Sequence, residues 1–210
     1  MIQIRHNGRR SGIWSSHALR MIVALLLSLA AVAPCAAQSG GVSELFGARV
    51  QAVPGVKSPL AHGDLDGDGV DDAAYFVKIT PAAADKSVAS DVQIVGLYGG
   101  EALGAKSSGH ALAITLKGGA QKFLVVDVHA GSAQGFFDSP SWSDPAGWLK
   151  SQKPLSTAKR GSTELKGYPC LGKQPAKSDV LLLLDGAGID EALAWTGKTF
   201  KICVDPTNDP

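Results

Sequence analysis

The sequence consists of short apolar segments separated by turn-forming residues, and this pattern argues against a helical fold. No window carries an apolar stripe at 3.6-residue spacing that is longer than about three turns. The segments are rich in β-branched or aromatic residues, alternate partially, and end at Gly, Pro, Asn, Asp or Ser. The predicted strands are Ala48–Val53, Ala73–Ile79, Val92–Leu97, Ala111–Lys117, Lys122–Val128, Val180–Leu184, Glu191–Trp195 and Lys198–Val204.

The residues between these segments predict turns and one long loop. Thr196 and Gly197 are typical of a hairpin turn between the last two strands. Residues 139–166 are polar and contain proline, which predicts a long loop with one helical turn at Asp144–Ser151. These features predict a mostly β, single-domain protein: a small antiparallel β domain or incomplete propeller, built from repeated strand-turn-strand units.

The first 37 residues differ chemically from the rest of the chain. Every acidic residue lies at or after Glu44, whereas four arginines precede an apolar run at 21–33. This run is shorter than the roughly 20 residues that a membrane span needs, and small residues follow it, which predicts a secretory signal peptide cleaved after Ala37. An uncleaved anchor is one alternative, and acylation of Cys35 is another, which the preceding proline disfavours. We therefore expect residues 38–210 to be exported to the periplasm or the extracellular space, without stable membrane insertion.

Removing this segment changes both the charge and the cysteine count. The whole chain has a net charge of +1, whereas residues 38–210 carry 16 basic and 19 acidic residues. This balance argues against nucleic-acid binding. Two cysteines remain, Cys170 and Cys203, and in an oxidising compartment they predict one disulfide, with two separate buried thiols as the alternative. Their spacing matches no zinc motif.

The most specific motif is an acidic loop at residues 64–72, where five of nine residues are aspartate. Carboxylates at alternate positions converge when the chain curls around a cation, and Gly69 permits the sharp turn. Tyr75 stands where an EF-hand would need a bidentate glutamate, so Asp72 is expected to close the site instead. Hard oxygen ligands suit Ca²⁺, whereas Mg²⁺ prefers few protein ligands and several waters; an acidic solvated turn is the alternative. The predicted ligands are Asp64, Asp66, Asp68, Val70 (through its carbonyl oxygen) and Asp72.

This loop, within residues 62–76, resembles the FG-GAP or VCBS-type repeat of integrin-like propellers. In that family a D-x-D-x-D-G-x-x-D loop binds calcium between two strands of a blade, which implies the same ligands here. A weaker copy at 184–195 aligns with 65–76 and keeps six of twelve residues. Because Leu183 and Ala187 replace the first and third aspartates, we expect this copy to keep the turn but not the metal.

The other reactive residues form no recognisable catalytic motif. Among the histidines after residue 37, His62 adjoins the acidic loop and is expected to shape its turn. His129 lies near Ser132, but no Gly-x-Ser-x-Gly elbow surrounds that serine. The sequence therefore predicts a non-enzymatic protein.

Four aromatic residues in and near the predicted long loop are candidates for partner binding: Phe136, Phe137, Trp142 and Trp148. Such side chains stack on sugars or anchor protein partners. The alternative is that they pack the loop onto the sheet.

These features together predict an exported calcium-binding β module with a structural role or a role in binding an unidentified protein or glycan. The alternative is a periplasmic inhibitor or immunity protein against a lysozyme-like cell-wall hydrolase. Such inhibitors often use a Ser-Gly-x-x-Tyr loop. Ser108 and Gly109 match it here, but Leu112 stands at the tyrosine position.

Overall fold

The structure is a computed structural model of the chain, and it describes residues 41–83, 87–98, 108–127, 135–139, 142, 154–173, 177–184 and 190–204. The chain divides into two units, Met1–Ser39 and Gly40–Pro210, and the described residues all belong to the second. The predicted signal peptide lies outside the described residues. Within these ranges, no helix is both long and apolar enough to span a membrane.

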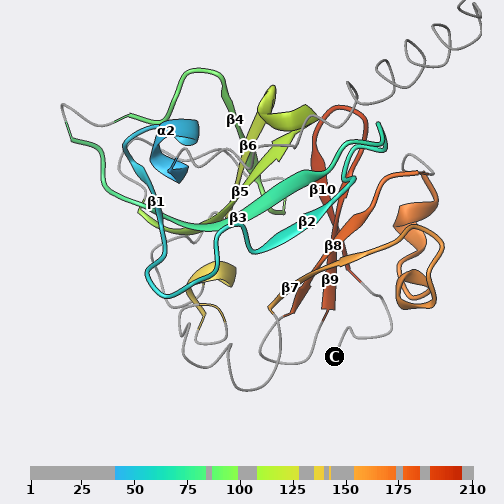
Figure 1. Cartoon of the computed structure of the whole chain (residues 1–210). Coiled ribbons are helices and arrows are strands. Elements are labelled where there is room, and N and C mark those ends of the chain that lie inside the picture. The colour runs from blue at the N-terminus through green and yellow to red at the C-terminus, as the bar shows by residue number, and fades with distance from the viewer. Residues whose placement is uncertain are drawn as a thin grey trace, which may run out of the picture. The chain divides into compact units, whose positions relative to one another are not determined.

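The described part of the chain is mostly β, as predicted, with ten strands and one short α-helix (Figure 1). The α-helix is α2 (Val42–Phe46), and the strands are β1 (Val50–Ala52), β2 (Ala61–Gly63), β3 (Asp72–Ile79), β4 (Val92–Gly96), β5 (Gly109–Leu116), β6 (Gln121–Val126), β7 (Leu155–Ala158), β8 (Val180–Leu184), β9 (Asp190–Trp195) and β10 (Phe200–Val204). Four 3₁₀ turns are η1 (Lys117–Gly119), η2 (Phe136–Asp138), η3 (Thr163–Leu165) and η4 (Pro169–Lys173).

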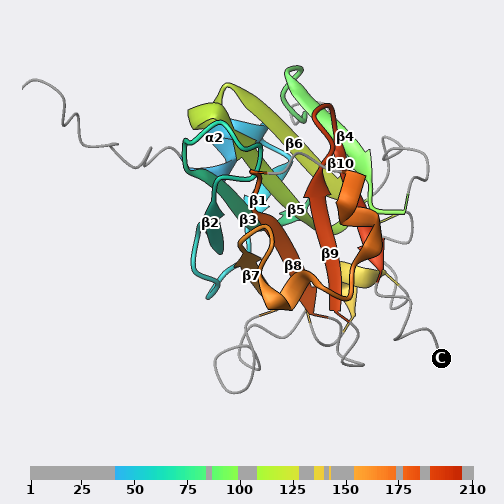
Figure 2. The same ribbon diagram turned by 90° about the vertical axis from the view of Figure 1, so that its right-hand side faces the viewer.

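The strands form two sheets, which Figures 1 and 2 show from two sides. The larger sheet has the order β1-β3-β5-β6-β4, with β2 also paired to β3, and only its β4–β6 pair is parallel. The smaller sheet, β10-β9-β8-β7, is antiparallel throughout. Among the described strands neither sheet closes on itself, which fits the prediction of a small or incomplete β architecture.

All eight predicted strands are present, with ends that differ by at most a few residues. The predicted hairpin turn is also present: the N–H of Thr196 donates to the carbonyl oxygen of Thr199 (2.9 Å), and Gly197 has a φ of 91°. The long loop predicted at 139–166 is wrong for residues 155–158, which form β7, and for the η3 turn that follows. β7 was missed because it is short and two of its four residues, Ser156 and Thr157, are polar. The helical turn predicted at 144–151 lies outside the described residues.

The main hydrophobic core contains residues of both sheets. Phe123 of β6 packs edge-on against Trp195 and Phe200 of the smaller sheet, at ring-centroid distances of 5.2 and 5.4 Å. A second cluster lies where α2 packs on the larger sheet, with Phe46 fully buried. Because β5 contributes to both clusters, it reads as a nearly continuous apolar run rather than an alternating one.

A disulfide joins Cys170 of η4 to Cys203 of β10, which confirms the predicted pairing. Their Cα atoms are 6.0 Å apart, an ordinary separation for bridged cysteines. The bridge therefore ties the segment between β7 and β8 to the edge strand of the smaller sheet.

Candidate metal centre

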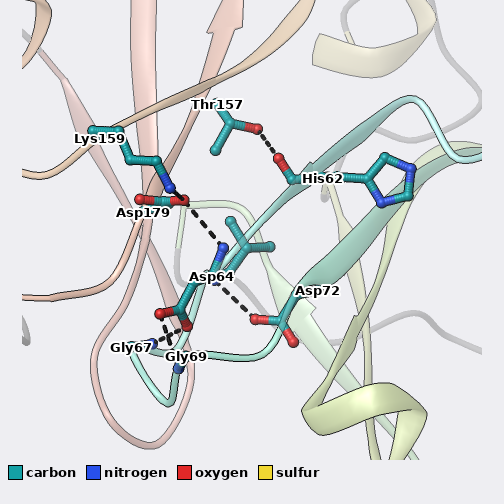
Figure 3. A network of polar contacts seen from close by, with 9 residues as sticks. His62, Asp64, Gly67, Gly69, Asp72, Thr157, Lys159 and Asp179 are labelled. Atoms are coloured by element: carbon teal, nitrogen blue, oxygen red, sulfur yellow. Dashed lines mark hydrogen bonds and ion pairs between the residues drawn. The ribbon is translucent and has the colours of Figure 1, made fainter. Parts of the chain in front are cut away.

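The acidic loop is closed at its base by the antiparallel pairing of β2 and β3, in which Gly63 lies opposite Asp72. Above this pair the loop folds around Asp64 (Figure 3). Its Oδ1 accepts a hydrogen bond from the N–H of Gly67 (2.8 Å), and its Oδ2 accepts one from Gly69 (3.0 Å). Both glycines have φ in the left-handed region, 81° and 87°, which side chains disfavour. The motif glycines thus allow backbone N–H groups to turn inward on the first aspartate.

Three of the predicted ligands converge. Asp64, Asp66 and Asp72 each offer a carboxylate oxygen, and these oxygens lie within 4.8 Å of one another. Oxygens bound to one Ca²⁺ at about 2.3–2.6 Å lie at most about 4.6–5.2 Å apart. The observed spacing is therefore compatible with one shared calcium ion, and carboxylate oxygens are the ligand type that calcium prefers.

Asp66 has a carboxylate oxygen whose surroundings fit a bound cation. Its Oδ1 accepts a hydrogen bond from the N–H of Asp68 (3.1 Å), whereas its Oδ2 is buried and has no hydrogen-bond partner among the described residues. Burial raises the pKa of Asp66, and the carboxylates of Asp68 and Asp64 add to this effect. A buried carboxylate oxygen without a donor is costly, so this atom fits a metal ligand.

Asp72, at the start of β3, is 2% exposed and has both oxygens engaged. Its Oδ2 accepts a hydrogen bond from the N–H of Leu65 (2.8 Å), and its Oδ1 accepts one from Lys117 (2.9 Å). Burial raises the pKa of Asp72 to about 7; the charge of Asp66 adds to the rise, and the backbone N–H groups of Leu65, Lys117 and Asp66 oppose it. The charge of Asp64 thus contributes to the raised pKa of Asp66, and the charge of Asp66 to that of Asp72, and a divalent cation would oppose both effects.

Two predicted ligands lie outside this group of three. Asp68 is exposed, and its Oδ1 accepts a hydrogen bond from the N–H of Val70 (2.8 Å). The side chain of Val70 is 45% exposed, as expected if only its carbonyl oxygen is used. Coordination by Asp68 and by the Val70 carbonyl oxygen therefore stays a prediction.

The loop is also attached to the smaller sheet by contacts that the sequence did not reveal (Figure 3). The N–H of Asp64 donates to Oδ2 of Asp179 (3.1 Å), and the N–H of Asp179 donates to the carbonyl oxygen of Asp64 (2.6 Å). Lys159 Nζ contacts the same Asp179 oxygen at 2.6 Å, and this hydrogen bond raises the pKa of Lys159. Thr157 Oγ1 donates to the carbonyl oxygen of His62 (2.8 Å). The contacts of Asp64 and His62 join residues 95 to 115 positions apart in the chain, so no local pattern could have predicted them.

Replacing Gly63 by alanine is expected to destabilise this junction by about 1–3 kcal/mol, because overpacking forces neighbouring groups apart. A Cβ atom on Gly63 would lie 2.6 Å from Cγ2 of Thr157 and 2.8 Å from Oδ2 of Asp179. Urea unfolding measures the loss. Gly172→Ala is the matched control, because a Cβ there meets no heavy atom within 4 Å. Equal stability of the two variants would contradict the close approach of β2 to the smaller sheet.

Three of the four aromatic residues predicted to bind a partner lie among the described residues, and none of these three is exposed. Phe137 and Trp142 are fully buried, with their ring centroids 5.2 Å apart, and Phe136 is half-buried against them. Phe137 and Trp142 belong to the main core and Phe136 packs against it, which favours the packing alternative, and a partner-binding role for the half-buried Phe136 stays a prediction. Trp148 lies outside the described residues.

Neither of the two histidines that the structure describes belongs to the group of three aspartates. His62 is exposed in β2, and its ring points away from the aspartates (Figure 3). His110 of β5 stacks on Phe76 at a centroid distance of 5.1 Å, and its Nδ1 lies 2.8 Å from Oδ1 of Asp138. His129 lies outside the described residues.

The segment compared with a hydrolase-inhibitor loop is part of the larger sheet. Residues from Gly109 onward form β5, which pairs with both β3 and β6, and Leu112 is fully buried. Residues 109–112 therefore lie in a strand of the sheet and not in a loop, and the alternative function stays a prediction.

The weaker copy of the motif also joins two antiparallel strands. β8 ends at Leu184 and β9 begins at Asp190, and these two residues are paired. Glu191 aligns with Asp72 of the intact copy, but its Oε1 accepts a hydrogen bond from the hydroxyl group of Tyr98 (2.8 Å). Residues 185–189 lie outside the described residues. Each copy thus lies between two antiparallel strands that pair with each other.

No family model, curated protein or solved structure matches the chain. The case for a function therefore rests on the residues themselves and on the geometry of the acidic loop.

Proposed function

We propose that this protein is a non-enzymatic, exported, calcium-binding β module of the FG-GAP or VCBS type. The observation that carries the proposal is the convergence of Asp64, Asp66 and Asp72, with Oδ2 of Asp66 buried and lacking a donor among the described residues. The motif of residues 64–72 supports the same conclusion from the sequence, and the apolar run before residue 37 supports export.

In this proposal the ion has a structural role. Asp64 binds the ion through its side chain and bonds Asp179 of the smaller sheet through its backbone. An ion held by Asp64 therefore also fixes the segment that joins β2 to the smaller sheet. Extracellular calcium modules have Kd values of about 10⁻⁴–10⁻³ M, so a site of this class would be largely occupied outside the cell. The binding partner of the module in this proposal is an unidentified protein or glycan.

Calcium is expected to raise the melting temperature of the protein comprising residues 38–210. An ion at 100 times its Kd adds about 2.7 kcal/mol to the free energy of unfolding, which corresponds to a rise of roughly 5–10 °C for a domain of this size. Thermal melts in calcium and in chelator measure the shift, and calorimetric titration gives the affinity. A melting temperature that stays constant up to 10 mM calcium, about ten times the weakest expected Kd, would overturn the proposal.

The ligand set is tested by Asp66→Asn against Asp71→Asn. Both substitutions remove one charge from the same loop, but Asp71 is exposed and lies outside the group of three. We expect Asp66→Asn to weaken calcium binding about tenfold or more, and Asp71→Asn to weaken it about threefold or less. In chelator, Asp66→Asn should be at least as stable as the unsubstituted protein, because it removes a buried negative charge. Equal losses of affinity in the two variants would indicate a diffuse acidic surface instead of a site.

A further inference from the structure

A second polar feature lies apart from the acidic loop, in the segment that links β7 to β8. Here a pocket of about 340 Å³ is bounded by η3, η4 and the turn at the end of β7. Its main lining residues are the polar Arg160, Ser162 and Lys166 and the apolar Leu165, Tyr168 and Leu171. This volume lies within the range of small-molecule sites, which combine an apolar lining with a few polar groups.

The apolar side of the pocket belongs to the core of the smaller sheet. Leu165, Tyr168 and Leu171 are 7%, 6% and 5% exposed and pack in one cluster with Cys203 of β10. The disulfide from Cys170 to Cys203 holds the same segment covalently. This side of the pocket is therefore formed before any ligand arrives.

The polar side of the pocket is cationic. Nη2 of Arg160 donates to the carbonyl oxygen of Leu171, which fixes the guanidinium at the wall, and Lys166 is exposed beside it. Arg160 and Lys166 are the charged residues among those that line the pocket. Their positive charges favour an anionic ligand.

One polar group of the wall has an unmet hydrogen bond. The backbone of Ser162 is engaged, because its N–H donates to the carbonyl oxygen of Lys159 (3.0 Å) and its carbonyl oxygen accepts from Leu165 (3.3 Å). Its Oγ is buried and has no hydrogen-bond partner among the described residues. Gly161 and Gly172 also line the pocket, and a Cβ on either would meet no heavy atom within 4 Å, so the wall is open at both positions.

We propose that this pocket binds a carboxylate that carries an apolar or aromatic group. A planar carboxylate matches the fork of a guanidinium, here that of Arg160, and can accept a further bond from Ser162 Oγ. The apolar group would lie against Leu165, Tyr168 and Leu171. A neutral apolar ligand would leave Ser162 Oγ without a partner, and a phosphate dianion carries no apolar group to lie against Leu165, Tyr168 and Leu171.

Titration of the protein comprising residues 38–210 with benzoate, benzamide, acetate and phosphate tests the proposal. We expect benzoate to bind with a Kd of about 0.1–1 mM, and benzamide and acetate each to bind about tenfold more weakly, because one lacks the charge and the other the ring. Phosphate should bind more weakly than benzoate. Equal binding of benzoate and benzamide, tighter binding of phosphate, or no binding of benzoate at 20 mM, some twenty times the weakest expected Kd, would each overturn it.

Variants locate the site. Lys166→Gln is expected to weaken benzoate binding about threefold to tenfold. Gly172→Glu, which adds a carboxylate at the open wall, should weaken it more than tenfold, whereas Gly172→Ala should leave it unchanged. Melting temperatures within about 3 °C of the unsubstituted protein show that each variant is folded. If folded Gly172→Glu binds benzoate as well as Gly172→Ala does, the ligand binds elsewhere and the proposal fails.

Discussion

Replacing Trp142 by alanine is expected to lower the free energy of unfolding by about 3–5 kcal/mol. Trp142 is fully buried, and its ring packs against Phe76 at 5.4 Å and Phe137 at 5.2 Å between centroids. The substitution removes a large side chain from a close-packed cluster. The protein then loses the transfer free energy of the buried ring and also loses the packing contacts around the cavity that remains. Urea unfolding measures the loss.

Val204→Ala is the control for this prediction, since Val204 is an apolar residue that is 43% exposed. This substitution should lower the free energy of unfolding by no more than about 0.5–1 kcal/mol. Trp142→Phe, which keeps most of the ring, should fall between the two. If Trp142→Ala lost no more stability than Val204→Ala, the tryptophan would have to lie at the surface, where a role in partner binding would again be open.

Breaking the disulfide is expected to cost about 3–4 kcal/mol, because the bridge closes a loop between residues 33 positions apart and so restricts the unfolded chain. The double substitution Cys170→Ser, Cys203→Ser removes it. Thermal or urea unfolding of the oxidised protein and of the double variant gives the difference.

A reductant provides the internal check on the disulfide. It should destabilise the unsubstituted protein to the level of the double variant and leave the double variant unchanged. The pocket adjoining Cys170 should loosen in parallel, because η4 loses its covalent tie to β10. Identical stability of the protein with and without reductant, under conditions where free thiols are detected, would contradict the predicted contribution.

The strands of this protein were predictable because each is encoded within a few neighbouring residues. β8, with the sequence Val-Leu-Leu-Leu-Leu, was predicted with the correct ends. β2 and β7 were missed because they are three and four residues long, and β2 includes His62 and Gly63, neither of which favours a strand. Both are strands because their neighbours supply hydrogen-bond partners, β3 for β2 and β8 for β7.

In the candidate metal centre, too, the local features were predictable from the sequence and the long-range contacts were not. The predicted ligands occupy a span of nine residues, so the convergence of three of them follows from local turn geometry, and the sequence named the three aspartates that come together. The attachment of the loop to Asp179 and Lys159 involves residues about a hundred positions away, and no spacing rule reaches that far.

By itself, the sequence determined the strand segments, the acidic loop with its turn glycines, and the pairing of the two cysteines, because alternation, ligand spacing and cysteine count are local or arithmetic properties. Only the tertiary structure decided that the aromatic residues lie in the core, that β4 and β6 are parallel, and that Asp179 holds the loop. These features depend on which apolar faces meet when the two sheets bury them, and that outcome is a property of the whole chain.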